Sequence, residues 1–336
     1  MALTDIDAGR LADNVFNNVG PFKNRIINGD MRIDQRNAGA SVNMSAVVYP
    51  VDRWAAFEDT DGAMTAQRST TAPAGFANSI VCTTTTADAS LAAAQYARVW
   101  QNLEGLNVAD LMWGTANAQS ISVSFWVRSS LTGTFGGSVA NSAFNRSYPF
   151  VYTISAVDTW EYKTVVIAGD TTGTWLTDNS TGLQLNFGLG VGSTFSGTAG
   201  SWAGTGYVSA TGATSVVATN GATFYITGVQ LEPGTVATPF ERRSYGQELS
   251  LCQRYYQTIQ PTVYTYAAGS STVYLPVTWQ PMRDTPVAAT VSQTLYSNTI
   301  SVTLVPEGPS GGRFNQATSG AGYGGASGTY SLSKEL

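Results

Sequence analysis

Five acidic residues could act in pairs, as the general acid and base of a glycoside hydrolase do: Glu58, Asp59, Asp61, Glu104 and Glu161. Such chemistry needs two carboxylates about 5 to 10 Å apart, but no motif in the sequence brings two of them together. The run from Glu58 to Asp61 precedes Gly62 and is typical of a solvated turn; a calcium site is the alternative. The chain has no histidine, which excludes Ser-His-Asp and Cys-His catalysis and the common zinc sites. We therefore expect a protein without enzymatic activity.

Trp202 and Tyr207 are the candidate ligand-binding residues. They flank Gly204 and Gly206, and aromatic rings in a glycine-rich loop can stack on the flat or apolar faces of sugars. The pair could therefore form a glycan-binding platform, and packing of the loop against the core is the alternative. Four other tryptophans lie among apolar neighbours and are expected in the core or at its rim: Trp54, Trp100, Trp113 and Trp126.

The remaining motifs predict neither a cofactor nor a metal site. Gly188, Gly190 and Gly192 alternate within an apolar stretch, whereas a phosphate-binding loop links a strand to a helix. Cys82 and Cys252 lack metal-ligand spacing and are too few for a disulfide framework, so we expect two buried free thiols.

Composition excludes several classes of protein. Charged residues make up only 12% of the 336 residues, against 43% apolar ones, and Ser, Thr, Asn, Gly and Ala fill the difference, as in β-structure with many turns. The net charge of −5 and the lack of a Lys or Arg run give nucleic acid no source of attraction. The sequence contains no stretch of about 18 apolar residues, so it does not predict membrane insertion. The acidic N-terminal segment does not fit a signal peptide. We expect synthesis in the cytoplasm.

The positions of these residues depend on strands with a period of two. Apolar side chains alternate with polar ones or glycine over residues 121–128 and 183–191. Residues 160–167 and 223–231 read as further strands, and Pro233 and Gly234 suit a type II turn after the second. Strands separated by turn signals indicate a jelly-roll β-sandwich. The fold class is therefore all-β.

The two ends of the chain carry different signals. Thr4 and Asp7 form a capping-box-like pattern that predicts a short N-terminal helix or arm. The arm could dock on another subunit, and a frayed terminus is the alternative. Ser244 and Gln247 form a capping box before apolar residues at helical spacing, namely Tyr245, Leu249, Cys252 and Tyr256. Strand alternation returns at residues 272–279, 287–291 and 299–305, whereas the glycine-rich stretch 311–328 is expected to form exposed loops. The predicted division is an arm at 1–23, a sandwich at 24–243, a connecting helix at 244–258 and a smaller β-domain at 259–336.

Four spaced motifs resemble one family. Residues 230–234 read QLEPG and residues 237–241 read ATPFE, and they are followed by Glu248, Leu249 and by CQRYY at 252–256. Upstream stand NRIINGDM at 24–31, IDQR at 33–36 and DRW at 52–54; downstream stand MR at 282–283, TP at 285–286 and the final EL. This pattern is similar to that of bacteriophage tail-fibre and related virion proteins, with residues 24–36 as the opening strand.

The resemblance implies a jelly roll like that of carbohydrate-binding modules, then a small β-domain, commonly assembled as a homotrimer. Relatives that bind carbohydrate often place an acid soon after the opening Asn-Gly as a calcium ligand, whereas Met31 and Arg32 follow Asp30 here. Charged motif residues are suited to fix the first strand against the last, so the motif is interpreted as structural and as containing no binding site. Its residues are Arg36, Arg53, Trp54, Gln230, Glu232 and Glu241.

These observations predict a structural subunit of a virion, of the tail-fibre type, that takes part in attachment to host-surface glycans. Its N-terminal region would dock on other virion proteins, and its C-terminal domain would be exposed. Glycine-rich loops near that end suit contact with host polysaccharide, and weak sites repeated threefold would gain avidity. A purely structural collar, neck or capsid decoration is the alternative.

Overall fold

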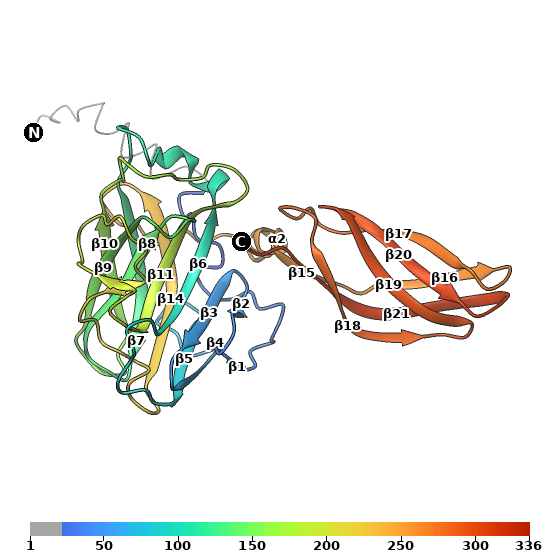
Figure 1. Cartoon of the computed structure of the whole chain (residues 1–336), viewed down its shortest axis with the longest axis horizontal. Helices are drawn as coiled ribbons and strands as arrows, with labels where there is room; N and C mark the ends of the chain where they lie inside the picture. The colour runs from blue at the N-terminus through green and yellow to red at the C-terminus, as the bar shows by residue number, and fades with distance from the viewer. Residues whose placement is uncertain (1–21) are drawn as a thin grey trace, which may run out of the picture. The chain divides into compact units, whose positions relative to one another are not determined.

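The computed structural model describes residues 22–336, and the helix or arm predicted at residues 1–23 lies almost entirely outside them. The chain divides into two compact units (Figure 1). Unit 1 ends at Arg242, and unit 2 comprises Arg243–Leu336.

Unit 1 is a jelly-roll β-sandwich of two antiparallel six-stranded sheets. In order across the first sheet, sheet A, the strands are β1 (Val42–Asn43), β4 (Ala63–Ser69), β5 (Ser79–Thr86), β14 (Thr223–Pro233), β7 (Ile121–Ser129) and β10 (Glu161–Ile167). Those of sheet B are β2 (Val48–Val51), β3 (Trp54–Asp59), β6 (Tyr96–Glu104), β11 (Thr181–Val191), β8 (Gly133–Ala140) and β9 (Ser147–Ile154). Two 3-10 turns (Gly105–Asn107 and Ala109–Leu111) and a short parallel pair, β12 (Ser196–Gly197) with β13 (Ser209–Ala210), complete the unit. The all-β prediction is confirmed.

The core of unit 1 lies between the two sheets and follows the predicted alternation. Val123, Phe125 and Val127 of β7 are fully buried, as are Leu183, Leu185, Phe187 and Leu189 of β11. Trp54, Trp100 and Trp113 are buried in the unit, as predicted, and Cys82 is a buried free thiol. Burial raises the pKa of the Cys82 thiol to about 12.

The outer side of β7 is less open than its pattern predicts. Ser122 and Ser124 alternate with the core residues, yet both are buried. They pair with Glu232 and Gln230 of β14, whose side chains bind the segment that follows β14 and folds back over this side of sheet A. The outer side of β7 is therefore covered at Ser122 and Ser124, whereas Trp126 and Arg128 are only partly buried.

The opening segment, residues 24–36, is irregular rather than the predicted strand. Asn28 and Met31 have positive φ angles of 57° and 59°, which no regular strand contains. The amide of Asn28 donates to the carbonyl of Ile33 (2.9 Å) and accepts from its N–H (3.0 Å). Asn24 pairs in the same manner with the backbone of β14. Side-chain amides thus replace the ladder bonds of a strand.

Unit 2 contains one helix and two small sheets. The helix α2 (Tyr245–Gln253) is capped by Ser244, whose hydroxyl accepts from the N–H of Gln247. The first sheet, called sheet D here, has the order β15 (Tyr256–Ile259), β21 (Gly322–Ser333), β16 (Thr262–Ala267), with β18 (Val287–Leu295) also paired to β21. The second has the order β17 (Thr272–Thr278), β20 (Gly311–Thr318), β19 (Thr299–Gly308). A small core between them contains Trp279, Phe314, Tyr330 and Leu332.

Two predictions for unit 2 were wrong in part. The helix ends at Gln253 instead of continuing to residue 258, because Tyr256–Ile259 pairs with β21 as a strand. Its apolar spacing also misplaced the buried face, since Tyr245 is exposed while Cys252 and Tyr255 are buried.

The glycine-rich stretch forms two central strands, β20 and β21, and not the exposed loops predicted. A Cβ atom on Gly312 would lie 2.2 Å from the carbonyl oxygen of Val305, and one on Gly328 would lie 2.4 Å from that of Ser292. Neighbouring backbones approach too closely for a larger residue at either position. The glycines therefore permit the sheets to form.

Candidate functional site

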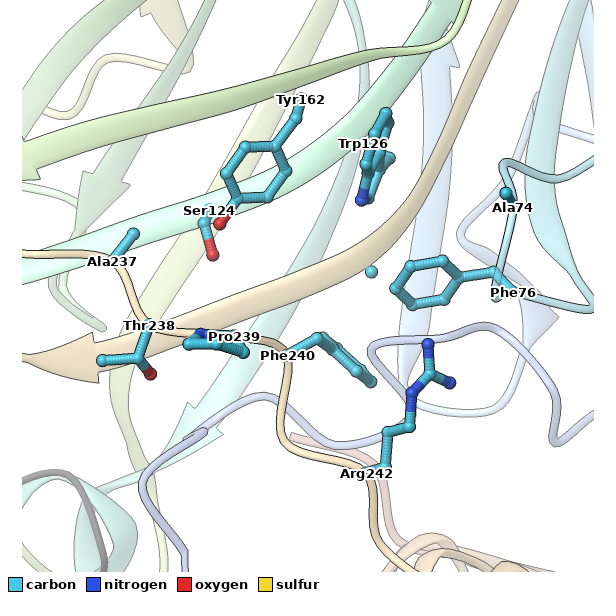
Figure 2. Close-up of a pocket in the computed structure, with 11 residues that line it drawn as sticks. Ala74, Phe76, Ser124, Trp126, Tyr162, Ala237, Thr238, Pro239, Phe240 and Arg242 are labelled. Carbon is cyan, nitrogen blue, oxygen red and sulfur yellow. The ribbon is translucent and has the colours of Figure 1, made fainter.

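An open groove of about 690 Å³ lies on the outer side of sheet A in unit 1. Figure 2 shows Trp126 and Tyr162 on one side of it, Pro239 and Phe240 on the other, and Phe76 at one end. The lining residues are Ala74, Phe76, Ser124, Trp126, Tyr162, Gly228, Ala237, Thr238, Pro239, Phe240 and Arg242.

The floor of the groove is shaped by an irregularity in β14. The pairing of β14 with β7 shifts register between Thr227 and Gln230, and Gly228 within the shift has φ of 61°. A Cβ atom there would lie 2.7 Å from Cζ of Phe76 and 3.1 Å from Cδ1 of Trp126. The bulge therefore leaves room for both rings only because residue 228 is glycine.

One wall of the groove is the segment that follows β14. Its Thr238 donates to the buried carboxylate of Glu232 through both the backbone N–H (2.8 Å) and the hydroxyl (2.6 Å). The N–H of Glu241 donates to Oε1 of Gln230 at 2.7 Å. Lys23 donates to the carbonyl of Pro239 and to Oγ1 of Thr238. Bonds to a charged carboxylate and a charged amine are stronger than neutral ones, so these contacts hold the wall in place.

The aromatic rings form two contacting pairs. The ring centroids of Trp126 and Tyr162 lie 5.5 Å apart, and those of Phe76 and Phe240 lie 5.2 Å apart in an edge arrangement. The guanidinium of Arg242 lies 4.7 Å from the centroid of Phe76 and donates to the carbonyl of Gly75 at 2.6 Å. Each pair therefore fixes its own ring orientation.

The chemistry of the groove is apolar stacking with few polar groups. Tyr162 is 44% exposed, so its ring is accessible to a ligand. Ser124 supplies a hydroxyl, and Arg242 is the one charged residue among those that line the groove. Flat rings with a few fixed polar groups suit a ligand that has both an apolar face and hydroxyl or carboxylate groups.

Trp202 belongs to a cluster of aromatic side chains elsewhere in unit 1. Its ring is half-buried and lies 5.3 Å from Trp113, 5.6 Å from Trp175 and 5.3 Å from Tyr148, between centroids. Its indole N–H donates to the carbonyl of Ala168. These contacts place Trp202 against the core.

Tyr207 lies on the same loop as Trp202. A Cβ atom on Gly197 would lie 2.3 Å from its ring, and its N–H donates to the hydroxyl of Ser147. Neither Tyr207 nor Trp202 lines the groove, and a glycan-binding role for the pair stays a prediction.

The residues assigned to the structural motif lie in two groups. Arg36 pairs with Asp52 at 3.3 Å, Arg53 donates to the carbonyl of Asn102, and the indole of Trp54 donates to the carbonyl of Asn28. The second group is Gln230, Glu232 and Glu241, beside the groove.

Glu241 connects the opening segment to the groove. Its carboxylate accepts from the N–H groups of Phe22 and Asn24, at 3.2 and 2.7 Å, and Asn24 in turn pairs with β14. The acids of the second group therefore bind backbone, amide and hydroxyl groups in the contacts described here.

The acidic residues do not assemble a metal site in the described part of the chain, where no group of three Asp, Glu, Cys or His residues could hold an ion. The solvated-turn prediction agrees with Asp59 and Asp61, which are exposed beside a bend at residues 60–62. It was wrong for Glu58, which is buried near the end of β3 and accepts from the N–H and hydroxyl of Thr60. Glu161 accepts from Lys163 and from two backbone N–H groups. Across residues 22–336, no helix is long and apolar enough to cross a membrane.

Sequence reasoning missed most of the groove. Trp126 was expected at the core or its rim, and Tyr162 and Phe76 carried no distinguishing pattern. Ala237, Thr238, Pro239 and Phe240 belong to the motif that was expected to contain no binding site, yet they form the wall. The available signal was the pair Pro239 and Phe240, two rigid apolar residues directly after a strand.

Comparison with known proteins gives structural likenesses at low sequence identity. No family model matches the chain, and no curated protein matches it. The enzymatically active domain of tailspike protein 4 of bacteriophage CBA120 is 14% identical over 64% of this chain, with a TM-score of 0.34, and the match spans 22% of that protein.

Two further likenesses are to carbohydrate-binding modules. A family 11 module from Clostridium thermocellum, in complex with a mixed-linked tetrasaccharide, matches over 60% of this chain and 100% of its own (14% identity, TM-score 0.29). The N-terminal cellulose-binding domain of a Cellulomonas fimi glucanase matches over 55% of this chain and 90% of its own, with 14% identity and a TM-score of 0.26.

Proposed function

We propose that this chain is a glycan-binding subunit of a virion appendage and that the groove of unit 1 contacts the sugar. The observation that carries the proposal is the pairing of Trp126 with Tyr162 along one side of an open groove. Pyranose rings have an apolar face that stacks on such side chains and hydroxyl groups that reach polar atoms at the edge. Arg242 lines the groove and supplies a charged polar group for those contacts.

Substitution of Trp126 tests the groove. We expect Trp126→Ala to weaken binding to host-surface polysaccharide by at least about tenfold, equivalent to about 1.4 kcal/mol, because the indole supplies the largest stacking surface. Binding of the full chain to immobilised host polysaccharide measures the effect. Trp160→Ala is the matched control, since Trp160 packs against Tyr225 of the same sheet and does not line the groove. Equal binding by the Trp126 variant and the natural protein would exclude the groove as the sugar-binding site.

The assignment to a virion rests on the resemblance of residues 24–36, 230–241 and 252–256 to tail-fibre proteins. Under this proposal the N-terminal region binds other virion proteins and the subunits form a homotrimer. Antibody labelling of particles in electron micrographs is expected to mark a fibre, and labelling of the neck or capsid instead would support the alternative of a structural decoration. A monomeric mass in light scattering would contradict the trimer.

The proposed subunit binds glycan without cleaving it. The support is chemical: the groove is lined by one charged residue, Arg242, and contains no carboxylate among its lining residues, whereas glycoside hydrolysis uses a pair of carboxylates. Incubation with host capsule is expected to release no oligosaccharide. If the natural chain released oligosaccharide and a variant of this chain did not, the protein would be an enzyme.

A further inference from the structure

Four tyrosines lie on one face of sheet D in unit 2, outside the groove described above. Tyr264 and Tyr266 are two residues apart on β16 and therefore point to the same side. Tyr266 pairs directly with Tyr323 of β21, and Tyr264 pairs with Gly325. The fourth, Tyr296, follows β18, and its N–H donates to the carbonyl of Gly325. We call this set the tyrosine face.

The rings of the tyrosine face contact one another in two pairs. Tyr264 and Tyr296 are stacked, with centroids 5.4 Å apart and planes inclined by 19°. Tyr266 and Tyr323 meet edge to face at 5.2 Å. Their positions are therefore fixed by neighbours, which lowers the entropy lost when a ligand binds.

Gly325 makes the stacked pair possible. A Cβ atom at this position would lie 2.6 Å from Cδ1 of Tyr264 and 2.4 Å from the carbonyl oxygen of Val263. The ring of Tyr264 thus lies over a residue without a side chain, close to the backbone of β21. The result is a flat aromatic surface on the sheet.

The tyrosine face is accessible, since Tyr264, Tyr266 and Tyr323 are 63%, 62% and 76% exposed. Large aromatic rings gathered at this exposure are typical of a surface that binds something. Rings with a hydroxyl group, among glycine, serine and threonine, are also the composition of adaptable binding surfaces. The groups that surround the rings therefore indicate the chemistry of the ligand.

The rings continue into a polar hollow of about 270 Å³. Its lining comprises Gln260, Pro261, Thr262, Ser327, Gly328 and Thr329. Ser327 joins the two regions, because its hydroxyl hydrogen-bonds to the hydroxyl of Tyr296 at 2.9 Å. Hydroxyl and amide groups beside a flat ring surface match a sugar, which has an apolar face and a rim of hydroxyl groups.

No charged residue occurs in the strands of sheet D: β15, β16, β18 and β21 consist of uncharged residues throughout. A surface without charges gives no electrostatic preference to an acidic ligand. We propose that the tyrosine face and its hollow bind a neutral polysaccharide, as a second saccharide site independent of the groove in unit 1.

The test uses the full chain with the groove inactivated by Trp126→Ala, and a panel of immobilised neutral polysaccharides built from glucose, galactose or mannose. We expect at least one member to bind, and the added pair Tyr264→Ala and Tyr323→Ala to lower that affinity about tenfold, because two stacking contacts are lost. The matched control is Tyr274→Ala, since Tyr274 is 61% exposed on β17 of the other sheet.

Three results would overturn the proposal: no binding to any member of the panel, equal loss in the Tyr274 variant, or a change of oligomeric state caused by the Tyr264 and Tyr323 substitutions. The last would identify the face as a contact between copies of this chain. Thermal unfolding of each variant separates lost binding from lost folding. Because the groove is inactivated throughout, failure here leaves the test of the groove unaffected.

Discussion

The groove of unit 1 and the tyrosine face of unit 2 both present aromatic rings, but different interactions hold the rings in place. In the groove, Phe240 is carried by a segment that leaves the sheet and is tied back through Glu232 and Gln230. In the tyrosine face, register alone brings Tyr266 opposite Tyr323. Register also brings Trp126 opposite Tyr162 in the groove, so the two sites share one device. They differ in the second wall of the groove, which depends on buried polar side chains at a distance from the ligand.

Both units contain a buried ion pair, which in unit 2 joins Arg243 to Glu248 at 3.4 Å, but charge differs at the two aromatic surfaces. Unit 1 contains buried ionic groups, among them Asp170, which is 1% exposed and binds Arg146 through two contacts of 2.7 and 2.8 Å. Sheet D of unit 2 has uncharged strands. Asp170 does not line the groove, so its effect should appear in the stability of unit 1, whereas binding at the groove should respond to salt through Arg242. Binding at the tyrosine face should not respond to salt.

Gly228→Val should break the groove with the largest effect on stability. Valine at φ 61° strains the backbone by about 1 to 2 kcal/mol, and its side chain overlaps Phe76 and Trp126 at a further cost of about 1 to 3 kcal/mol. We expect unit 1 to lose about 3 kcal/mol in urea unfolding. Tryptophan fluorescence is the readout, because seven of the eight tryptophans precede Arg242.

Gly212→Val is the control for Gly228. Gly212 also has a positive φ, 80°, but a Cβ atom there meets nothing within 4 Å. The Gly212→Val variant should therefore lose only the stability that backbone strain costs, without the part due to side-chain overlap. Equal losses in the two variants would mean that the rings do not crowd residue 228.

Acid should destabilise unit 1 through Asp170. Burial opposes the charge of this carboxyl, but hydrogen bonds from Arg146 and Thr172 outweigh it and hold the pKa of Asp170 below its ordinary value. Its stabilising contribution is present above the unfolded pKa of about 3.9 and disappears as the pH falls through the lowered folded value. Asp170→Asn should cost about 2 kcal/mol at pH 7, less than a fully buried pair because Arg146 keeps some solvent contact.

The pH dependence of unfolding tests this contribution in unit 1. Unfolding of the Asp170→Asn variant should show a smaller decrease in stability between pH 5 and the acid range than the natural chain shows, when followed by tryptophan fluorescence. If the stability of the two proteins fell equally as the pH is lowered, Asp170 would not contribute to the acid sensitivity of unit 1.

The sequence predicted the features that depend on a single strand, namely its position and the burial of its side chains. In β7 and β11 the alternation of Val123, Phe125, Leu185 and Phe187 with small or polar residues predicted both the strands and their buried face. The cap at Ser244 is equally local, because it is one bond to the N–H of Gln247 within four residues. These features need no knowledge of the rest of the chain.

The sites could not be predicted in the same way. Phe76 and Phe240 meet only after the whole sandwich has closed, so no spacing in the sequence connects them. Gly325 gave no signal either, since its role is to lie beneath Tyr264 from another strand. The glycine-rich stretch was interpreted as loop for the same reason: the partners that fill the space beside its glycines are far away in the chain.

Salt dependence should give the smallest and most specific difference between the two sites. Raising the ionic strength from about 0.1 M to about 1 M shortens the screening length from about 10 Å to about 3 Å. Binding of a neutral polysaccharide to the tyrosine face should change less than about twofold, because the strands of sheet D contribute no charge. Binding of an acidic glycan to the groove should weaken several-fold through Arg242, and Arg242→Gln should abolish that dependence while leaving the stacking of Trp126 and Tyr162 intact. Isothermal titration at the two salt concentrations measures both. If the affinity of the groove in the natural chain did not change with salt concentration, Arg242 would not contact the ligand. The aromatic rings would then be the common basis of recognition in both units.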